Sequence, residues 1–397
     1  MLIGIVGKPN VGKSTFFSAA TLAPAEIASY PFTTIKPNKG VAYIRARCPH
    51  LDLGESCNPR NSACENGVRL IPVELLDVAG LVPDAWQGKG LGNQFLDDLR
   101  QADALIHVVD ASGSTDAEGS PVPAHSHDPL MDVRFLEKEI DHWIKGILEK
   151  GWEKAARQAH LEGGKIEEVI HNRLTGLGIS LAQIHASVRE AALPESVISW
   201  KGEELMRLSS ALRKHSKPLM LSLNKADVAE DAMLERLRRI EGYISIPTCA
   251  QSELALRKAA KAGVIRYMPG DEGFQIIDAG RLTPPQMKGL EYIQTHVMSR
   301  FKGTGVQQCL ENAAFNMLGL IPVYPVEDEH KWTDKQGNVL PDAYLVRKGS
   351  TARDLAYKIH TDLGENFIRA INCRTQRVVG QDYLLQAGDV ITIVTKK

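Results

Sequence analysis

Four short apolar runs in the chain have the pattern of strands that are buried on both faces. They lie at residues 2–6, 69–80, 104–112 and 218–227, and each runs into glycine or polar residues. The segments between them are long enough for helices, which parallel strands need as crossover connections. The pattern therefore predicts a doubly wound α/β sheet.

Between residues 116 and 216 the apolar residues have helical spacing, and no further apolar strand-like run occurs. The stretch is introduced by a loop rich in Gly, Ser, Pro and His (114–129), and charges of both signs then separate the apolar side chains. Phe135, Ile140, Ile144 and Leu148 recur at helical spacing. We predict a helical insertion at 116–216, which divides a main domain formed by residues 1–115 and 217–318.

The last segment, residues 319–397, changes character again. Strand-like stretches at its two ends enclose a helical stretch at 350–364. Thr351 and Asp354 have the spacing of a helix-capping pair, and Gly364 is expected at the far end of the helix. This order predicts a small sheet with one helix across it, in a domain large enough to fold alone.

Residues 7–14, GKPNVGKS, match the phosphate-loop pattern G-x-x-x-x-G-K-[ST] between a predicted strand and a predicted helix. In such a loop, backbone N–H groups surround phosphate oxygens, the lysine places a cation on the β and γ phosphates, and the serine offers its hydroxyl to magnesium. The helix N-terminus adds its dipole. The candidate phosphate-binding residues are Gly7, Lys8, Pro9, Asn10, Val11, Gly12, Lys13, Ser14 and Thr15.

The stretch DVAGLV, residues 77–82, follows the second apolar run. Asp77 is the candidate for a second magnesium-associated carboxylate, and Gly80 supplies a backbone N–H that senses the γ phosphate. Switch proteins that hydrolyse GTP with a glutamine carry it directly after this glycine, where this chain has Leu81. An isobutyl group cannot orient a water molecule, so another group must do so if hydrolysis occurs.

The fourth apolar run ends in NKAD, residues 224–227. A carboxylate at Asp227 accepts hydrogen bonds from N1 and N2 of guanine, and adenine offers no such pair of donors. We expect Asn224 to hold the loop and touch N7, and the Lys225 stem to cover the base. In the later stretch PTCAQSE, the Ala250 amide is expected to meet the guanine O6, with Cys249 where serine is usual.

Together with YPFTTIKPN (30–38) and residues 77–112, these motifs resemble the Obg and YchF-type translation-factor GTPases. Residues from 340 onward resemble the TGS domain, a ubiquitin-like β-grasp module. The expected fold class is thus α/β: a P-loop GTPase doubly wound sheet with a helical insertion and a C-terminal β-grasp (TGS) domain. The resemblance covers nearly the whole chain.

The resemblance implies a molecular switch that slowly hydrolyses GTP and works with the ribosome or rRNA. It implies that Thr34, or alternatively Thr33, coordinates magnesium in the GTP state. Many YchF proteins have lost the aspartate of the base-reading motif and prefer ATP, whereas this chain keeps Asp227. We therefore expect GTP or GDP with Mg²⁺; the alternatives are a YchF-like ATPase and a non-catalytic adaptor that nucleotide stabilises.

The expected catalytic residues are Lys13, Thr34, Gly80 and Asn10. The cation-dependent GTPases that this loop resembles use the loop asparagine to bind K⁺ against the α and γ phosphates. Asn10 is therefore a candidate for holding potassium, where the cation's charge would replace that of an arginine finger. The alternative is that Asn10 only braces the loop by hydrogen bonds.

Composition limits the partners and the cellular location to be expected. The chain of 397 residues has 43% apolar and 24% charged residues and a net charge of −1, so any basic surface that binds RNA must be local. Residues 256–270 are locally basic; a solvated helix face is the favoured interpretation, with an RNA-binding patch as the alternative. No apolar run approaches the roughly 20 residues of a membrane span, and Gly7 leaves no room for a cleaved signal peptide. We expect a monomeric, cytoplasmic protein.

Two groups of metal-ligand residue types lie outside these motifs. Cys48, His50, Cys57 and Cys64 lack a paired C-x-x-C, so free thiols are the favoured interpretation, with a structural metal or a redox switch as alternatives. His125, His127 and Asp128 are interpreted as part of a solvated loop. Six cysteines in a chain of this length do not indicate a disulfide framework.

Overall fold

The computed structural model describes residues 1–22, 38–78 and 92–396. Its contacts divide the chain into two compact units. Of the described chain, the first unit holds residues 1–22, 38–40, 74–78 and 92–309, and the second holds residues 41–73 and 310–396. The predicted domain boundaries at residues 116, 217 and 319 stay predictions, because a division by contacts does not test them.

The sheet that carries the candidate site has the strand order β2-β4-β1-β5-β6-β7, with β3 paired to β4. The pairs β4–β1, β1–β5, β5–β6 and β6–β7 are parallel. The strands are β1 (Leu2–Val6), β2 (Lys39–Arg47), β3 (Ala63–Glu65), β4 (Val68–Asp77), β5 (Ala104–Asp110), β6 (Leu219–Asn224) and β7 (Ser245–Thr248). Every residue of β1, β5 and β6 is buried, which confirms the strands predicted from apolar runs.

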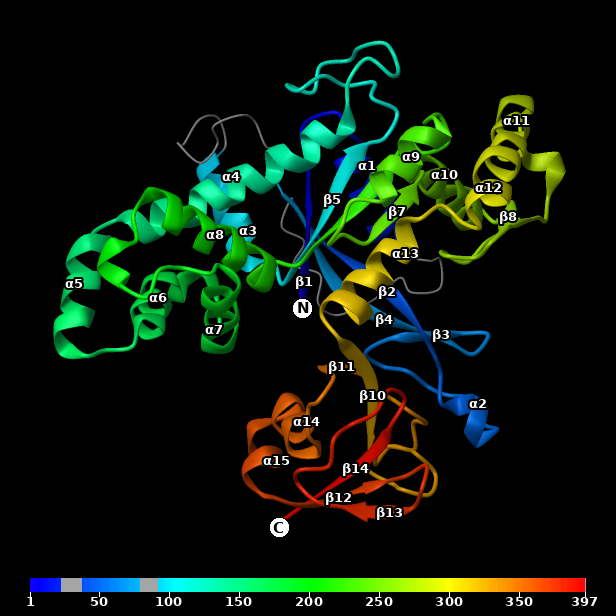
Figure 1. The fold of residues 1–397 in the computed structure, drawn as a ribbon. Helices are drawn as coiled ribbons and strands as arrows, with labels where there is room; N and C mark the ends of the chain where they lie inside the picture. The colour runs from blue at the N-terminus through cyan, green and yellow to red at the C-terminus, as the bar shows by residue number, and fades with distance from the viewer. Residues whose placement is uncertain (23–37, 79–91, 397) are drawn as a thin grey trace. The chain divides into compact units, whose positions relative to one another are not determined.

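Helices flank the parallel strands of the first unit (Figure 1). Helix α1 packs against α10, and α3 lies along β1. The helices that directly follow strands of this sheet are α1 (Lys13–Thr21), α3 (Gly92–Gln101), α9 (Asp231–Arg238) and α10 (Ala250–Lys261). After the short pair β8 (Ile265–Arg266) and β9 (Gln275–Ile276) come α11 (Pro284–Ile293), α12 (Ser299–Phe301) and α13 (Val306–Glu311).

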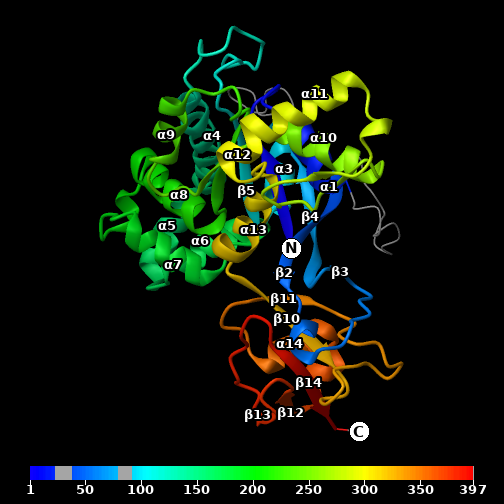
Figure 2. The ribbon, with the colours of Figure 1, turned by 90° about the vertical axis from the view of Figure 1, so that its right-hand side faces the viewer.

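Five further helices occupy the stretch between β5 and β6. They are α4 (Pro129–Glu149), α5 (Trp152–Glu162), α6 (Ile166–Leu174), α7 (Leu181–Glu190) and α8 (Gly202–Ser216). Ile140, Ile144 and Leu148 are buried along α4, as their spacing predicts, and α4 packs against α8. Helices α5, α6 and α7 lie together, away from α10 and α11, in both views (Figures 1 and 2).

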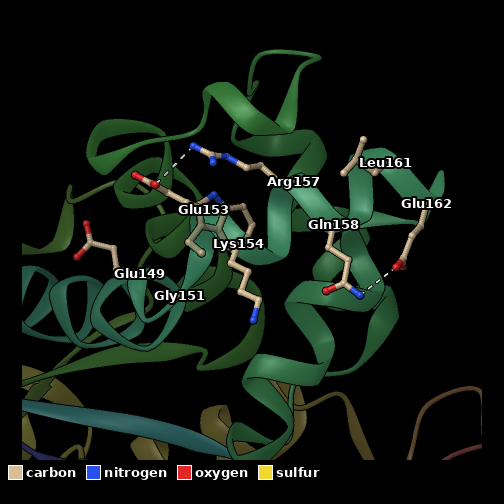
Figure 3. A pocket seen from close by; sticks show the side chains of 9 residues that line it. Glu149, Gly151, Glu153, Lys154, Arg157, Gln158, Leu161 and Glu162 are labelled. Carbon is tan, nitrogen blue, oxygen red and sulfur yellow. Dashed lines mark hydrogen bonds and ion pairs between the residues drawn. The ribbon is translucent and has the colours of Figure 1, made fainter.

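The helical stretch carries a surface hollow along α5. A solvent-open hollow of about 680 Å³ runs along α5, where Glu153, Lys154 and Arg157 project from the helix (Figure 3). Beneath it, the rings of Trp152 and Trp200 stack with their centroids 5.8 Å apart. The hollow is lined by residues 149–162 alone, so it contains none of the nucleotide-binding candidates.

The second unit contains a five-stranded sheet in the order β11-β10-β14-β12-β13. Helix α14 lies against β12 and β14, around a core that includes Val323, Leu355 and Ile391. The elements are α2 (His50–Leu53), β10 (Leu320–Val326), β11 (Tyr344–Arg347), α14 (Ala352–Ile359), α15 (Thr361–Glu365), β12 (Phe367–Asn372), β13 (Arg377–Val379) and β14 (Val390–Thr395). A small mixed sheet with a helix across it is the predicted β-grasp arrangement.

The predicted helix at 350–364 is correct at its start and wrong at its end. Thr351 and Asp354 form the expected capping box. The helix stops at Ile359 because His360 adopts an extended conformation and its Nδ1 accepts the Asp362 N–H, so that a second short helix begins. Gly364 lies inside that second helix, where a Cβ would come within 2.3 Å of the Tyr357 ring.

Among the described residues, no helix combines the length and the apolar character needed to cross a bilayer.

Candidate functional site

The carboxyl ends of the parallel strands bring the predicted motifs to one edge of the sheet. Asp110 is in register with Asn224, and Asn224 with Thr248. On the other side, Asp77 is in register with Ile5, two residues before Gly7. Ligands of doubly wound sheets bind at this edge, so the fold places the phosphate-binding and base-reading candidates where one nucleotide can reach both.

Close backbone approach explains two glycines of the phosphate loop. Gly7 has a φ of 149°, and a Cβ there would lie 2.5 Å from the Val108 carbonyl oxygen. Gly12 has a φ of 98° and directly precedes α1, and its Cβ would lie 2.3 Å from Nδ2 of Asn224. A side chain at either position would strain the turn and push apart the elements around it. The loop can therefore keep its backbone N–H groups close to a ligand.

Lys13 is a buried cation at the start of α1. Its Nζ donates to the Lys8 carbonyl oxygen at 2.9 Å. Burial lowers the pKa of the Lys13 ammonium, and the Asp77 carboxylate opposes that shift. A phosphate at the loop would supply the negative charge that this buried ammonium lacks.

Ser14 and Asp77 form an oxygen pair beside Lys13. The Ser14 hydroxyl donates to Oδ2 of Asp77 at 3.2 Å. Burial raises the pKa of Asp77, while Lys13 and Ser14 act in the opposite direction. A hydroxyl and a partly buried carboxylate are ligands that Mg²⁺ accepts alongside phosphate oxygens and water, so the donor set fits the metal predicted for this position.

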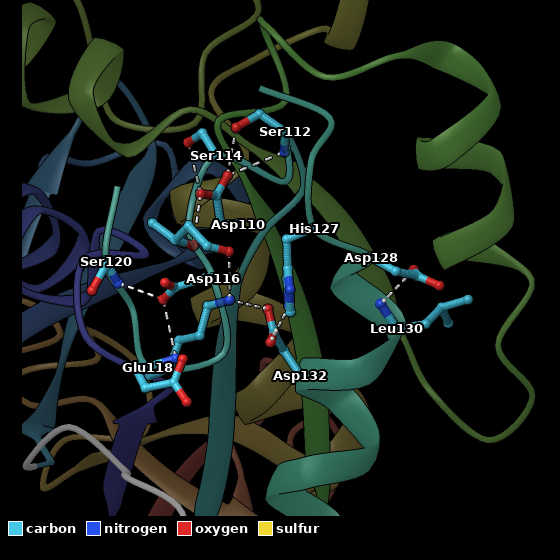
Figure 4. Close-up of polar contacts among 12 residues, drawn as sticks. Asp110, Ser112, Ser114, Asp116, Glu118, Ser120, His127, Asp128, Leu130 and Asp132 are labelled. Carbon is cyan, nitrogen blue, oxygen red and sulfur yellow. Dashed lines mark hydrogen bonds and ion pairs between the residues drawn. The ribbon is translucent and has the colours of Figure 1, made fainter. Parts of the chain in front are cut away.

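The Lys8 side chain points into the protein instead of toward a nucleotide. Its Nζ lies 2.8 Å from Asp132 of α4 and donates to the Thr115 carbonyl oxygen at 3.0 Å. His127 contacts the second oxygen of Asp132 at 2.8 Å (Figure 4). Lys8 thus ties the phosphate loop to the loop before α4, and its backbone alone remains available as a phosphate ligand.

Asn10 makes a second connection to the same loop. Its Nδ2 donates to the Gly119 carbonyl oxygen at 2.9 Å, and Gly119 packs so closely on Pro9 that a Cβ would lie 2.6 Å from the Pro9 carbonyl oxygen. Asn10 itself is exposed and has a φ of 61°. This hydrogen bond uses the amide nitrogen of Asn10, so the amide oxygen is the atom that a cation would contact.

Asn224 joins the two halves of the site. Its Nδ2 donates to the Val11 carbonyl oxygen at 2.8 Å, and its Oδ1 accepts the Ala250 N–H at 3.1 Å. Lys225, with a φ of 58°, donates to Asp110 at 2.8 Å and to Ser114 at 3.0 Å. Burial acts to raise the pKa of Asp110. The hydrogen bonds that Asp110 accepts from Lys225 and Ser112 outweigh burial, so this pKa is lowered (Figure 4).

Asp227 is half-buried, and two residues that the sequence motifs did not indicate lie against it: Tyr292 contacts its carboxylate, and Arg300 contacts the backbone of its loop. Tyr292 of α11 donates to Oδ2 of Asp227 at 3.1 Å. Arg300 donates to the carbonyl oxygens of Ala226 at 3.2 Å and Ala229 at 3.3 Å, and so braces the loop. Cys249 is buried nearby; burial and then the Asp227 charge raise the pKa of its thiol.

Several predicted residues lie outside the described part of the chain. These are Thr33 and Thr34 of the first switch segment and Gly80 and Leu81 of the second. Their roles stay predictions.

Within residues 125–128, interpreted as a solvated loop, His125 is exposed, whereas His127 and Asp128 contact other parts of the first unit. His127 pairs with Asp132, whereas Asp128 caps α4 and pairs with Arg236 at 3.0 Å. In the basic stretch 256–270, Arg257 is buried and bonded to Glu253 and to the Ala20 carbonyl oxygen. Arg257 is therefore not available to RNA.

Comparison with known proteins identifies the family. Three family models match the chain. The model of the 50S ribosome-binding GTPases matches residues 2–144, and the model of the G4-motif domain of Obg-like, YGR210-like GTPases matches 222–328. The TGS-domain model matches 333–395. A protein of Haemophilus influenzae named ribosome-binding ATPase YchF is 29% identical, over 98% of this chain and 97% of its own. An uncharacterized GTP-binding protein of Methanocaldococcus jannaschii is 54% identical over 99% of both chains. The chain belongs to the YchF-type, Obg-like GTP-binding proteins.

Two solved structures share the fold of this chain. A GTP-binding protein from Pyrococcus horikoshii is 46% identical, covers all of both chains and superimposes with a TM-score of 0.79. The YchF GTPase of Schizosaccharomyces pombe covers 99% of this chain and 97% of its own, with a TM-score of 0.61. At 20% identity the second comparison shows the shared fold alone. The predicted family and the predicted fold class are both confirmed.

One buried histidine under the phosphate loop of this YchF-type protein gives a pH prediction. Burial, with Lys13 and Lys8 nearby, lowers the pKa of His107 to about 3. Histidine in the unfolded chain has a pKa of about 6.5. Between about pH 3 and pH 6.5, His107 therefore binds a proton in the unfolded chain but stays neutral in the native state. The stabilisation by neutral His107 is therefore complete above about pH 6.5 and is lost as pH falls toward 3.

We expect the free energy of unfolding to fall by on the order of 2 kcal/mol more in the wild type than in His107→Gln when pH drops from about 7 to about 5. Urea unfolding of both proteins at the two pH values measures the difference. Parallel pH profiles of the two proteins would show that His107 is protonated in the native state.

Proposed function

We propose that this protein is a guanine-nucleotide switch that hydrolyses GTP slowly to GDP and phosphate and binds the ribosome or its RNA in one nucleotide state. It acts, in this proposal, as a monomer in the cytoplasm. The observation that carries the proposal is the position of Asp227. It lies at the end of the loop whose Asn224 bonds both the phosphate loop, at Val11, and the second base loop, at Ala250.

Each part of the site has a task in this proposal. Backbone N–H groups from Gly7 to Thr15 bind phosphate oxygens, and Lys13 neutralises the β and γ phosphates. Ser14 and Asp77 hold Mg²⁺, which would neutralise charge that develops on the phosphates. Asp227 accepts from guanine N1 and N2, and the Ala250 amide donates to O6. In the segments outside the described residues, Thr34 coordinates Mg²⁺ in the GTP state and Gly80 senses the γ phosphate.

The absence of a glutamine at Leu81 makes slow hydrolysis the expected basal behaviour. We propose that K⁺ held by the Asn10 amide oxygen supplies positive charge beside the α and γ phosphates. The Asn10–Gly119 hydrogen bond supports this proposal because it fixes the amide nitrogen on the protein side. A backbone amide or a ribosomal partner then orients the attacking water.

The names of relatives keep one alternative open. The Haemophilus influenzae YchF is named a ribosome-binding ATPase, so an adenine-nucleotide function for the present chain is the principal rival. Asp227 favours guanine, because adenine would leave that carboxylate without its two donors.

The ribosome part is tested by sedimentation of the purified chain with ribosomes in a non-hydrolysable GTP analogue, in GDP and without nucleotide. We expect several-fold more protein in the ribosomal pellet with one of the two nucleotides. Lys13→Ala, which weakens phosphate binding, should remove that difference. Equal pelleting of the wild type in all three conditions would favour an adaptor whose partner binding ignores the nucleotide.

A further inference from the structure

Three cysteines and one histidine converge in the second unit, in the part of the chain between the phosphate loop and Asp77. Cys48 follows β2, His50 begins α2, Cys57 lies in the next loop, and Cys64 is in β3. Their ligand atoms all lie within 4.8 Å of one another. The fold brings them together because the β3–β4 hairpin turns back, and the Cys48 N–H donates to the Gly67 carbonyl oxygen at 2.8 Å.

Three separations among these ligand atoms are close to those of a tetrahedral zinc site. The sulfurs of Cys48 and Cys57 lie 3.8 Å apart. Nδ1 of His50 lies 3.3 Å from the Cys57 sulfur and 3.5 Å from the Cys64 sulfur. Zinc with bonds of about 2.3 Å to sulfur and about 2.0–2.1 Å to nitrogen would place sulfurs about 3.8 Å apart and sulfur and nitrogen about 3.6 Å apart.

A disulfide accounts for the cluster less well. Bonded sulfurs lie about 2.05 Å apart, far less than the separation of Cys48 and Cys57, and the cysteines are free. A disulfide would also use two of the thiols and leave the third thiol and the imidazole without a role. A set of three thiolates and one imidazole is, by contrast, a standard complement for structural zinc.

A buried arginine next to the cluster provides independent support. Arg69 is 0% exposed, and its Nε and Nη1 have no hydrogen-bond partner among the described residues. It is in register with Cys64 in the β3–β4 pair. Zn²⁺ with three thiolates and a neutral imidazole carries one net negative charge, which would compensate the buried guanidinium.

We infer that Cys48, His50, Cys57 and Cys64 bind one structural Zn²⁺. All four positions of the tetrahedron are protein ligands, so the site is closed and has no position for a substrate. This inference rests on the second unit alone and does not depend on the proposed nucleotide function.

The metal would order residues 54–62, which contact residues 334–343 of the same unit. The Asn58 N–H donates to the Val339 carbonyl oxygen at 2.9 Å, and the Arg60 N–H donates to that of Pro341 at 2.7 Å. Arg60 also pairs with Asp342 at 2.8 Å. Residues 54–62 contain few apolar side chains of their own, so cross-linking Cys57 and Cys64 to Cys48 fixes a loop that burial alone would leave weakly ordered.

Metal analysis of the purified full-length chain tests the inference. We expect one zinc per chain after dialysis, and a loss of that zinc in Cys57→Ser and Cys64→Ser. The matched control is Cys373→Ser, which removes a buried thiol of the same unit outside the cluster and should keep one zinc. Cys57→His retains a zinc ligand and should restore binding at least about tenfold relative to Cys57→Ser.

Cobalt substitution tests the site without relying on variants that fold poorly. Wild-type protein stripped with a chelator and titrated with Co²⁺ should develop the thiolate charge-transfer and tetrahedral d–d absorption bands, which Zn²⁺ then abolishes. A chain that takes up no metal, or that binds equal metal in the cluster variants and the wild type, overturns the inference. A mass decrease of two hydrogens from a disulfide among these cysteines overturns it as well.

Discussion

Asp227→Asn is expected to lose the preference for guanine over adenine nucleotides and to gain binding of xanthine nucleotides. The wild-type carboxylate accepts two hydrogen bonds from guanine, and leaving it unpaired costs on the order of 2–4 kcal/mol, or roughly 30- to 1000-fold in affinity. An asparagine offers one acceptor and one donor, which suit the N1–H and the C2 carbonyl of xanthine. Titrations with labelled GDP, ADP and XDP measure the change.

The gain of xanthine binding separates a changed base pocket from a damaged protein. Glu241→Gln, an exposed carboxylate beyond α9, is the matched control and should retain the wild-type preference. If Asp227→Asn discriminates GDP from ADP as strongly as the wild type, the base is read by other groups, and Asp227 serves only Tyr292 and the loop around it.

Potassium is expected to accelerate GTP hydrolysis at least about tenfold over sodium at equal ionic strength, and Asn10→Ala should remove most of that difference. An arginine finger at the corresponding position is worth about 10³–10⁵ in rate, which sets the scale for a fixed positive charge there. Single-turnover hydrolysis in the two salts, with and without ribosomes, measures the effect.

Gly119→Ala distinguishes cation binding from bracing of the loop. A Cβ at residue 119 would collide with Pro9 and disturb the hydrogen bond from Asn10, but it does not remove the Asn10 carboxamide. If Asn10 binds potassium, Gly119→Ala should keep part of the potassium response that Asn10→Ala loses. Equal rates in potassium and sodium for the wild type, with and without ribosomes, would mean that the activating group comes from another molecule.

Local patterns were sufficient to predict the sheet and the nucleotide motifs. β1, β5 and β6 are mostly apolar and are buried throughout; Gly7 directly follows β1, and Asp110 and Asn224 are the last residues of β5 and β6. The period of α4 was equally clear, because Ile140, Ile144 and Leu148 lie on one buried face. In each case neighbouring residues determine the structure, so the sequence pattern carries the information.

Contacts between distant segments were not predictable in this way. Tyr292 and Arg300 reach the base loop from residues about seventy positions away, and no local pattern marks them. Lys8 fits the phosphate-loop motif, yet its side chain pairs with Asp132 of α4. The four candidate zinc ligands lack a paired spacing because a hairpin brings them together, so their proximity appears only in the folded chain.

The most direct test of the central claim, a guanine-specific nucleotide site, is a side-by-side titration of the nucleotide-free wild-type chain with labelled GDP and labelled ADP in magnesium. The structure predicts GDP binding that is roughly 30- to 1000-fold tighter, because Asp227 finds its two donors in guanine alone. Equal affinities, or tighter binding of ADP, would contradict the account and place this chain with the relatives that are named ATPases.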